Sequence, residues 1–467
     1  MGMATWTAQE WAKDEFGGTD LGDARRTERL VEVGAALAEK AGGTLPKVLG
    51  GWAELKAAYR LLHRPEVTLE AMGRPHWERV RCGCEARGEY LLIEDTTELD
   101  YTAHEAVEGL GRIGDDRGRG FLLHTTLAVR LEGWNKEGEP VANMLGLFGQ
   151  QLWTREGQPK RGRETKTARW KRPRESQKWG AMLEETNGPP VGSRWIEVGD
   201  READVAETYA RCAARGADWI VRAASDRALE AEDRHLFKAV ALAPVRGQFE
   251  LRLRARPGKP ARRAQLEVRS RTVTLRGPWR PGGRLASQQM QVVYVQEVDA
   301  PHGTEALKWI LLTSLPCETL TQCVKVVKRY SLRWLVEEYH KALKTGTGVE
   351  ESQLETAAAL RALIAVLALV AARLLALKLV ARVAPQQAMD ASMLGPEHWA
   401  VLENKYGRPP GGWTTRATLV AIARLGGFLA RKGDGDPGWL TIWRGWQRMM
   451  DLAEGYLLAR SRNARCG

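Results

Sequence analysis

Apolar residues in the first 70 positions recur at the three- and four-residue spacing typical of helices. We predict one helix from the N-cap Asp23 to about residue 40 and a second helix over Trp52–Leu62. The inner side of the first helix is apolar: Leu30, Val33 and Leu37. Its outward side begins with three arginines: Arg25, Arg26 and Arg29. A small helical module with a basic face is therefore predicted, although solvated helix faces often have the same composition.

From about Glu89 the pattern changes to that of strands. EYLLIEDTTELDY, GFLLHTTLAVRLEG and VANMLGLFGQQLW are predicted strands, and a tight turn joins the last two. After a basic segment, the pattern alternates between a helix over 177–186, the strand RWIEV, a helix over 203–215 and the strand ADWIVRA. Hairpin-like strands followed by alternating helix and strand predict a mixed sheet in an α/β domain.

A second strand-like region follows, and it is strongly basic. Residues 251–284 contain eleven Lys or Arg against one acid, Glu267, and we predict a β-rich insertion there. KWILLTS at 308–314 and a long helix over 319–344 follow, and the rest is predicted to be helical. Near the end, apolar residues recur at helical steps: Trp439, Trp443, Trp446, Met450, Ala453 and Leu457. This stripe predicts packing on another helix, within the chain or in a dimer.

The most apolar stretch, 361–385, is interrupted by Arg373 and Lys378. Its uncharged run is shorter than the roughly 20 residues that span a bilayer, so we predict a buried helix and no membrane contact. The N-terminal residues lack the basic start and apolar run of a signal peptide. The six cysteines lack the paired spacing of a zinc site. We therefore expect a cytoplasmic protein with reduced thiols.

The charge balance adds a preference for partners. The chain has 70 Lys and Arg against 58 Asp and Glu, a formal net charge of +12. Such a surplus favours polyanions, with nucleic acid ahead of membrane surfaces. A hydrophobic content of 43% argues against global disorder.

The predicted helix over 319–344 has two contrasting faces. At 100° per residue, an arc about 80° wide carries polar side chains: Tyr330, Arg333, Glu337, Lys341 and Lys344. The opposite side is apolar: Leu332, Leu335, Val336, Tyr339 and Leu343. The helix alone is compatible with a solvated face that has favourable i,i+4 ion pairs.

Two aspartates change the interpretation of that helix. Asp95 lies at the polar end of the strand YLLIED, and Asp200 directly follows the strand RWIEV. Such carboxylates can converge at one sheet edge beside a glutamate on a packed helix. A trio of this kind supplies the hard oxygen ligands that Mg²⁺ prefers. Two such ions would assist in-line phosphoryl transfer.

These residues lie within motifs of a known family. IEDTT around Asp95, GDREAD around Asp200 and the spaced pattern Y-x2-R-x3-E-x6-K from Tyr330 to Lys344 resemble the DDE triad and YREK signature of Tn5-type and related insertion-sequence transposases. Further segments resemble that family in the same order, including LGDARRTERLV, AAYRLLHRPEV, EEYHKALKTGTG and AIARLGGFLARK. The resemblance covers nearly the whole chain.

The resemblance implies an α/β fold: an RNase H-like catalytic core with a β-rich insertion, flanked by helical N-terminal and C-terminal domains. The implied divisions are an end-recognition domain over 1–70, a catalytic domain over 71–370 with its insertion at about 240–305, and a dimerisation domain over 371–467. Asp95, Asp200 and Glu337 are the implied ligands of two Mg²⁺ ions, for which Mn²⁺ can substitute. Their neighbours do not fit the motif register: Asp100, Asp204 and Glu338.

The resemblance also implies roles in DNA binding. Tyr330, Arg333 and Lys344 match residues that grip phosphates at the cleavage site, and Arg222 matches another active-site arginine. Trp309 matches the tryptophan that stacks on a flipped base, which offsets part of the cost of extruding it. Further DNA contacts are expected from His340 and Lys341 beside the site and from the arginines of the first helix: Arg25, Arg26 and Arg29.

The implied activity is cut-and-paste transposition of DNA. A metal-activated water nicks one strand, the freed 3′-hydroxyl forms a hairpin that is reopened, and the ends are joined to target DNA. The implied partners are transposon ends with inverted repeats, target DNA and a second copy of the chain, in a cytoplasmic, nucleoid-associated setting. Two alternatives stay open: a metal-dependent endonuclease without strand transfer, and a silent DNA-binding descendant. The basic segment 155–178 departs from the family, and we expect DNA contacts or a solvated loop there.

Overall fold

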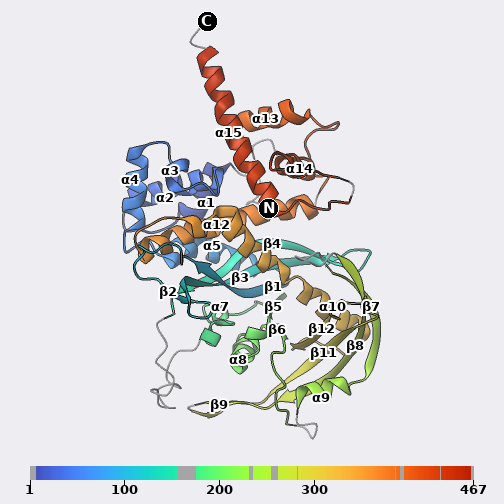
Figure 1. Ribbon diagram of the computed structural model, residues 1–467. Coiled ribbons are helices and arrows are strands. Elements are labelled where there is room, and N and C mark those ends of the chain that lie inside the picture. Colours follow the sequence, from blue (N-terminus) through green and yellow to red (C-terminus); the bar gives the residue numbers. More distant parts are fainter. Residues whose placement is uncertain are drawn as a thin grey trace.

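A computed structural model describes most of the chain (Figure 1). The described residues are 7–155, 175–230, 235–253, 261–280, 282–383, 385–389, 394–431 and 433–463. Most of the basic segment 155–178 lies outside these ranges, so its role stays a prediction.

Helices form the N-terminal part, as predicted: α1 (Ala8–Phe16), α2 (Ala24–Glu39), α3 (Leu45–Val48), α4 (Trp52–Leu62) and α5 (Leu69–Gly83). Asp23 caps α2 by accepting a hydrogen bond from the backbone N–H of Arg25. The predicted inner residues of α2 are buried. The helix pattern and its cap therefore determined this part of the fold.

A mixed sheet forms the centre of the molecule and confirms the predicted α/β architecture. Its first strands are β1 (Gly88–Asp100), β2 (Gly111–Ile113), β3 (Gly118–Trp134), β4 (Pro140–Trp153), β5 (Ser193–Gly199) and β6 (Asp218–Arg222). β3 pairs antiparallel with both β1 and β4, whereas β1, β5 and β6 are parallel neighbours. The carboxyl ends of β1 and β5 therefore meet at the same edge.

The predicted β-rich insertion extends this same sheet. Its main strands are β7 (Val245–Leu253), β8 (Arg262–Leu275) and β11 (Gln288–Val298), which join β6 through β12 (Lys308–Thr313). A short helix, α9 (Leu236–Ala241), precedes them. Two further short strands, β9 (Trp279–Arg280) and β10 (Gly283–Arg284), pair only with each other among the described residues.

Helices cover both faces of the sheet. A short turn, η1 (Glu175–Lys178), leads into the helices that pack on one face: α7 (Ala181–Glu184), η2 (Arg201–Ala203), α8 (Ala206–Arg215) and α9. The other packs against α10 (Leu320–Ser331), α11 (Trp334–Lys341) and α12 (Ala357–Val383). The helix predicted over 177–186 is divided, because Gly180 at φ 68° leaves the helical conformation between η1 and α7.

The prediction of one continuous helix over 319–344 is wrong. α10 ends at Ser331, α11 begins at Trp334, and a π-helical turn, η3 (Ala342–Gly346), follows. Ser331 Oγ donates to the carbonyl of Lys328 at 2.7 Å, a bond that competes with the helix backbone and favours a bend. The predicted apolar face is nevertheless buried along its whole length. A 3-10 turn, η4 (Val349–Glu351), leads on towards α12.

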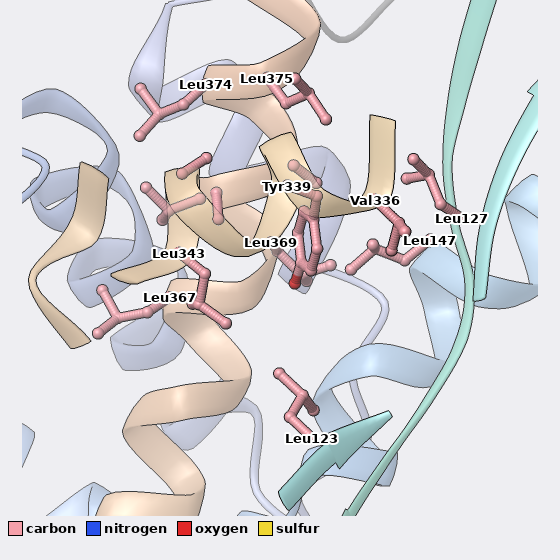
Figure 2. Packing of buried hydrophobic residues seen from close by; sticks show 14 of the residues in the cluster. Leu123, Leu127, Leu147, Val336, Tyr339, Leu343, Leu367, Leu369, Leu374 and Leu375 are labelled. Carbon is pink, nitrogen blue, oxygen red and sulfur yellow. The ribbon is translucent and has the colours of Figure 1, made fainter. Parts of the chain in front are cut away.

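The long apolar helix α12 is a core helix. The segment Ala357–Leu379 is long and apolar enough to cross a membrane. However, 89% of an apolar 18-residue window within it is buried inside the protein. Leu367 and Leu369 of α12 pack beside Tyr339 and Leu343 (Figure 2). The guanidinium of Arg373 lies 5.2 Å from the ring centre of Trp11 in α1. Helix α12 therefore joins the N-terminal helices to the central sheet.

The C-terminal part contains α13 (Pro396–Tyr406), α14 (Thr415–Leu425) and α15 (Trp439–Asn463). The apolar stripe of α15 packs largely within the chain. Trp443 is buried beside Gly42, and Trp446 Nε1 donates to the carbonyl of Glu39 at 2.9 Å. The expectation that this stripe forms a dimer contact is therefore wrong for its buried part. Only its distal end is exposed, where Leu457 is 50% exposed.

Candidate active site

The two aspartates of the predicted triad lie at neighbouring parallel strands, Asp95 within β1 and Asp200 directly after β5. Asp95 lies on β1 on the same face as Ile93, because side chains alternate along a strand. Ile93 pairs with Val198 in β5, and continuing this register two residues places Asp95 beside Asp200. Asp200 directly follows β5 and caps η2 by accepting from the N–H of Glu202 at 2.8 Å.

Glu337 approaches the same edge from the first turn of α11. Arg333 links it to β1: Nη1 of Arg333 donates to Asp95 Oδ2 at 3.2 Å, and Nη2 donates to Glu337 Oε1. Burial raises the pKa of Asp95 to about 6. The negative charges of Asp200 and Glu337 also raise it, while Arg333 opposes the shift. Asp200 and Glu337 therefore both lie close enough to Asp95 to influence its ionisation.

The donor set suits a hard divalent cation. Carboxylate oxygens are the ligands that Mg²⁺ and Mn²⁺ accept, with water and phosphate completing the shell. As the side chains stand, however, no three acidic, His or Cys residues within the described ranges are arranged around a common ion position. The cation between Asp95 and Glu337 is the guanidinium of Arg333.

A groove with a volume of about 2160 Å³ is lined by one carboxylate of the triad, Glu337, and by Arg333. It is lined by residues from the central sheet, the β insertion and α11, including Arg222, Trp309, Tyr330, Arg333, Glu337 and Lys341. Five of the six residues in this set are basic or aromatic, and such side chains bind phosphates and bases.

Tyr330 and Trp309 form one wall near the triad. Their rings meet edge to face, with centroids 5.1 Å apart. Arg222 lies half-buried beside Tyr330, and Nη2 of Arg222 donates to the carbonyl of Lys308 at 3.2 Å. Burial lowers the pKa of Arg222 from its usual value. The structure thus brings these three predicted residues together with Arg333.

The remaining predicted site residues are placed differently. His340 is only 7% exposed, and burial lowers its pKa to about 3, so the expectation of a DNA contact from this side chain is corrected. It points inward because it follows the buried Tyr339 on the packed side of α11. Lys341 pairs with Glu338 at 3.0 Å rather than with Glu337. Lys344 pairs with Glu350 at 3.1 Å.

The three neighbouring acids that were set aside all have structural partners. Asp100 Oδ1 accepts hydrogen bonds from Thr102. Asp204 pairs with Arg227 at 2.6 Å. Glu338 faces away from the triad, towards α12 and α15. These contacts agree with the motif register, which excludes the three residues from the site.

Sequence reasoning missed a buried polar network behind Asp95. Thr96 donates its N–H to Asp95 Oδ1 at 2.9 Å, and its hydroxyl lies 2.9 Å from Nδ1 of His124. Glu94 lies on the same face of β1 as Thr96, opposite to Asp95. Its carboxylate accepts hydrogen bonds from the hydroxyl of Thr126 and from the N–H of Gly180. The polar residues within IEDTT and LLHTT, in otherwise apolar strands, were the available signal.

The basic face of the N-terminal helices also differs from the prediction. Each arginine near the start of α2 already has an acidic partner: Arg25 with Asp23, Arg26 with Glu66 and Arg29 with Glu32. The outward face of α4 presents Trp52, which is 74% exposed, together with the exposed Lys56 and Arg60. These three lie within about 80° on one helix face.

Three protein-family models match the chain. The model described as "Transposase DNA-binding" matches residues 8–67, and the model described as "Transposase DDE domain" matches residues 194–372. The model described as "Transposase Tn5 dimerisation domain" matches residues 368–466. They follow one another in the order of the N-terminal helices, most of the catalytic sheet and the C-terminal helices. The DDE match contains Asp200 and Glu337 and begins after Asp95.

Proposed function

Because the chain belongs to the Tn5-type DDE transposases, we propose that it performs cut-and-paste transposition with Asp95, Asp200 and Glu337 as its metal ligands. The observation that carries this proposal is the convergence of the three carboxylates around Arg333 at the groove. The preferred ions are two Mg²⁺ per site, with Mn²⁺ as a substitute.

The site residues divide the chemistry between them. The bound ions would activate the attacking oxygen and stabilise the leaving oxygen of an in-line displacement. Asp95 and Asp200, on parallel strands, form a rigid side of the site, whereas Glu337 completes it from α11. Successive displacements at one site would nick the end, form and reopen a hairpin, and join the 3′-hydroxyl to target DNA.

The groove would hold the cleaved strand by its phosphates. Arg333 and Arg222 offer forked donors, and Tyr330 offers a hydroxyl. Lys344 would add a point charge after releasing Glu350. Trp309 would stack on an extruded base, because its ring forms part of the groove wall beside Tyr330.

For end recognition, we propose the outward face of α4 ahead of the start of α2. Lys56 and Arg60 supply positive charge, and Trp52 supplies an exposed ring that can pack on the sugar and base edges of DNA. Arg25, Arg26 and Arg29 would first have to leave their acidic partners. The α4 face needs no such exchange and lies within the DNA-binding match.

Homodimer formation agrees with the dimerisation match over residues 368–466. We propose that the contact lies at the distal end of α15, where three apolar residues are exposed: Leu452, Leu457 and Leu458. Three exposed leucines within seven residues are unusual for a monomer surface. The cytoplasm, close to the nucleoid, is the setting that such DNA substrates require.

The test uses the full chain, Mg²⁺ and DNA that carries the inverted repeats flanking its gene. Hairpin and strand-transfer products are expected from the wild-type protein, and Glu337→Gln should bind the ends but form no product. Cleavage without hairpins or joining would favour the endonuclease alternative. End binding without any chemistry would favour the silent DNA-binding alternative. Undiminished cleavage by Glu337→Gln would remove this residue from the metal site.

A further inference from the structure

Arg333 occupies the centre of the carboxylate cluster. It stands at the N-cap of α11, one turn before Glu337, and its side chain is largely buried. Its two terminal nitrogens bond to carboxylates from different elements, Asp95 on β1 and Glu337 on α11. The guanidinium thereby neutralises negative charge that would otherwise repel across the gap.

This position conflicts with metal binding. Both oxygens of Asp95 are engaged, Oδ2 by Arg333 and Oδ1 by the N–H of Thr96, and Oε1 of Glu337 is engaged by Arg333. A divalent ion needs these same oxygens, and its charge would repel the guanidinium at such short range. The described carboxylates accordingly surround no common ion position in this arrangement. Arg333 and a metal ion therefore exclude one another between Asp95 and Glu337.

The groove offers Arg333 a second anion. Arg333 lines this groove together with Arg222 and Tyr330, where a DNA phosphate would lie. A phosphate accepts the forked guanidinium as well as a carboxylate does. A modest side-chain movement towards the groove would release Asp95 and Glu337 together.

We infer that Arg333 closes the metal site of the DNA-free protein and opens it when a DNA phosphate takes over its guanidinium. This inference rests on the proposed function, since it assigns the metal to Asp95 and Glu337. It makes DNA and metal mutually reinforcing ligands, because each favours the conformation that the other requires. The enzyme would then assemble its metal site only on bound DNA.

The first experiment measures Mn²⁺ binding to the DNA-free full chain by calorimetry or electron paramagnetic resonance. At pH 8, we expect Arg333→Gln to bind Mn²⁺ about tenfold more tightly than the wild type, because its carboxylates are released. Arg222→Gln is the matched control, since it removes the same charge from the same groove without touching a carboxylate. Equal affinities in the wild type and Arg333→Gln, or equal gains in both variants, would overturn the inference.

The second experiment adds a short DNA duplex of arbitrary sequence with 5′-phosphates. The duplex should increase the Mn²⁺ affinity of the wild type, and the increase should be markedly smaller in Arg333→Gln. At duplex concentrations that saturate each variant, Arg222→Gln should keep most of the increase, because its carboxylates are closed by Arg333 as in the wild type. An identical increase in the wild type and Arg333→Gln would show that DNA does not act through this side chain.

Asp95→Asn separates this inference from the proposed function. If Asp95→Asn abolishes Mn²⁺ binding while Arg333→Gln leaves it unchanged, the metal site stands and only the closing role of Arg333 fails. If Asp95→Asn binds Mn²⁺ as the wild type does, the metal is held elsewhere and the proposed function itself fails. Thermal unfolding of each variant checks that it remains folded.

Discussion

Glu337 and Glu338 are adjacent acids whose roles should separate cleanly. Glu338 accepts hydrogen bonds from Lys378 Nζ at 2.8 Å, Lys341 Nζ at 3.0 Å and Trp439 Nε1 at 2.8 Å. It thereby connects α11 to the core helix α12 and to the C-terminal helix α15. Glu338→Gln should therefore weaken the fold, whereas Glu337→Gln should remove chemistry and leave the fold nearly intact.

The size of the stability loss expected for Glu338→Gln follows from the pKa of Glu338. Burial opposes ionisation, but Lys378 and Lys341 outweigh it and lower the pKa from 4.5 to about 2. A shift of this size corresponds to roughly 3 kcal/mol of stability in the fully ionised state. Solvent screening reduces this contribution, because the side chain keeps 16% exposure and Lys341 is more exposed. We therefore expect Glu338→Gln to lower the free energy of unfolding by about 2 kcal/mol at pH 7.

The pH dependence provides an independent test. Because the folded-state pKa is lowered, the stabilisation is complete above 4.5 and is lost as the pH falls towards about 2. Urea unfolding followed by circular dichroism gives the free energy of unfolding of each protein. The difference between the wild type and Glu338→Gln should be constant from pH 7 to 5 and should narrow below pH 4.5. Glu337→Gln is the matched control. A gap below about 0.5 kcal/mol at pH 7, or one that widens on acidification, would refute the assigned ion pairs.

Three further predictions concern the helical domains. Gly445→Ala should destabilise the chain by several kcal/mol, because its Cβ would lie 1.7 Å from the carbonyl oxygen of Ile422, whereas Gly438→Ala, with open space around its Cβ, should unfold at nearly the wild-type temperature. Trp52→Ala should weaken binding of the inverted-repeat ends by about tenfold in a gel-shift assay and leave melting unchanged; a larger loss in Arg25→Ala would return end recognition to α2. Leu457→Ser should shift the full chain towards monomer in analytical ultracentrifugation, and an unchanged dimer would place the contact elsewhere.

Much of the local structure could be predicted from the sequence. The cap at Asp23 and the apolar spacing behind it located α2, and the bounds predicted for α4 match those observed. The alternating and continuous apolar runs located the strands of the central sheet. Such features depend on residues close together in the chain, so the sequence pattern contains the required information.

The candidate site was predictable in its membership but not in its arrangement. The motif spacing selected Asp95, Asp200 and Glu337, and the structure brings them to one sheet edge. The inward position of His340 depends on packing that no helical projection of a single element includes. The break between α10 and α11 likewise depends on a local hydrogen bond of Ser331 that apolar periodicity does not register.

The sequence by itself selected the three carboxylates that we propose as metal ligands, most of the helices and strands, and polyanions as favoured partners. Only the tertiary structure decided which charges are already paired. Arg26 meets Glu66, and Arg333 meets Asp95, across long separations in sequence. A cation's availability for DNA depends on such partners, because an ion pair must be broken before a phosphate can replace it. Spatial pairing is therefore the reason that we propose α4 ahead of α2 as the DNA surface, and it placed Arg333 between the proposed metal ligands Asp95 and Glu337.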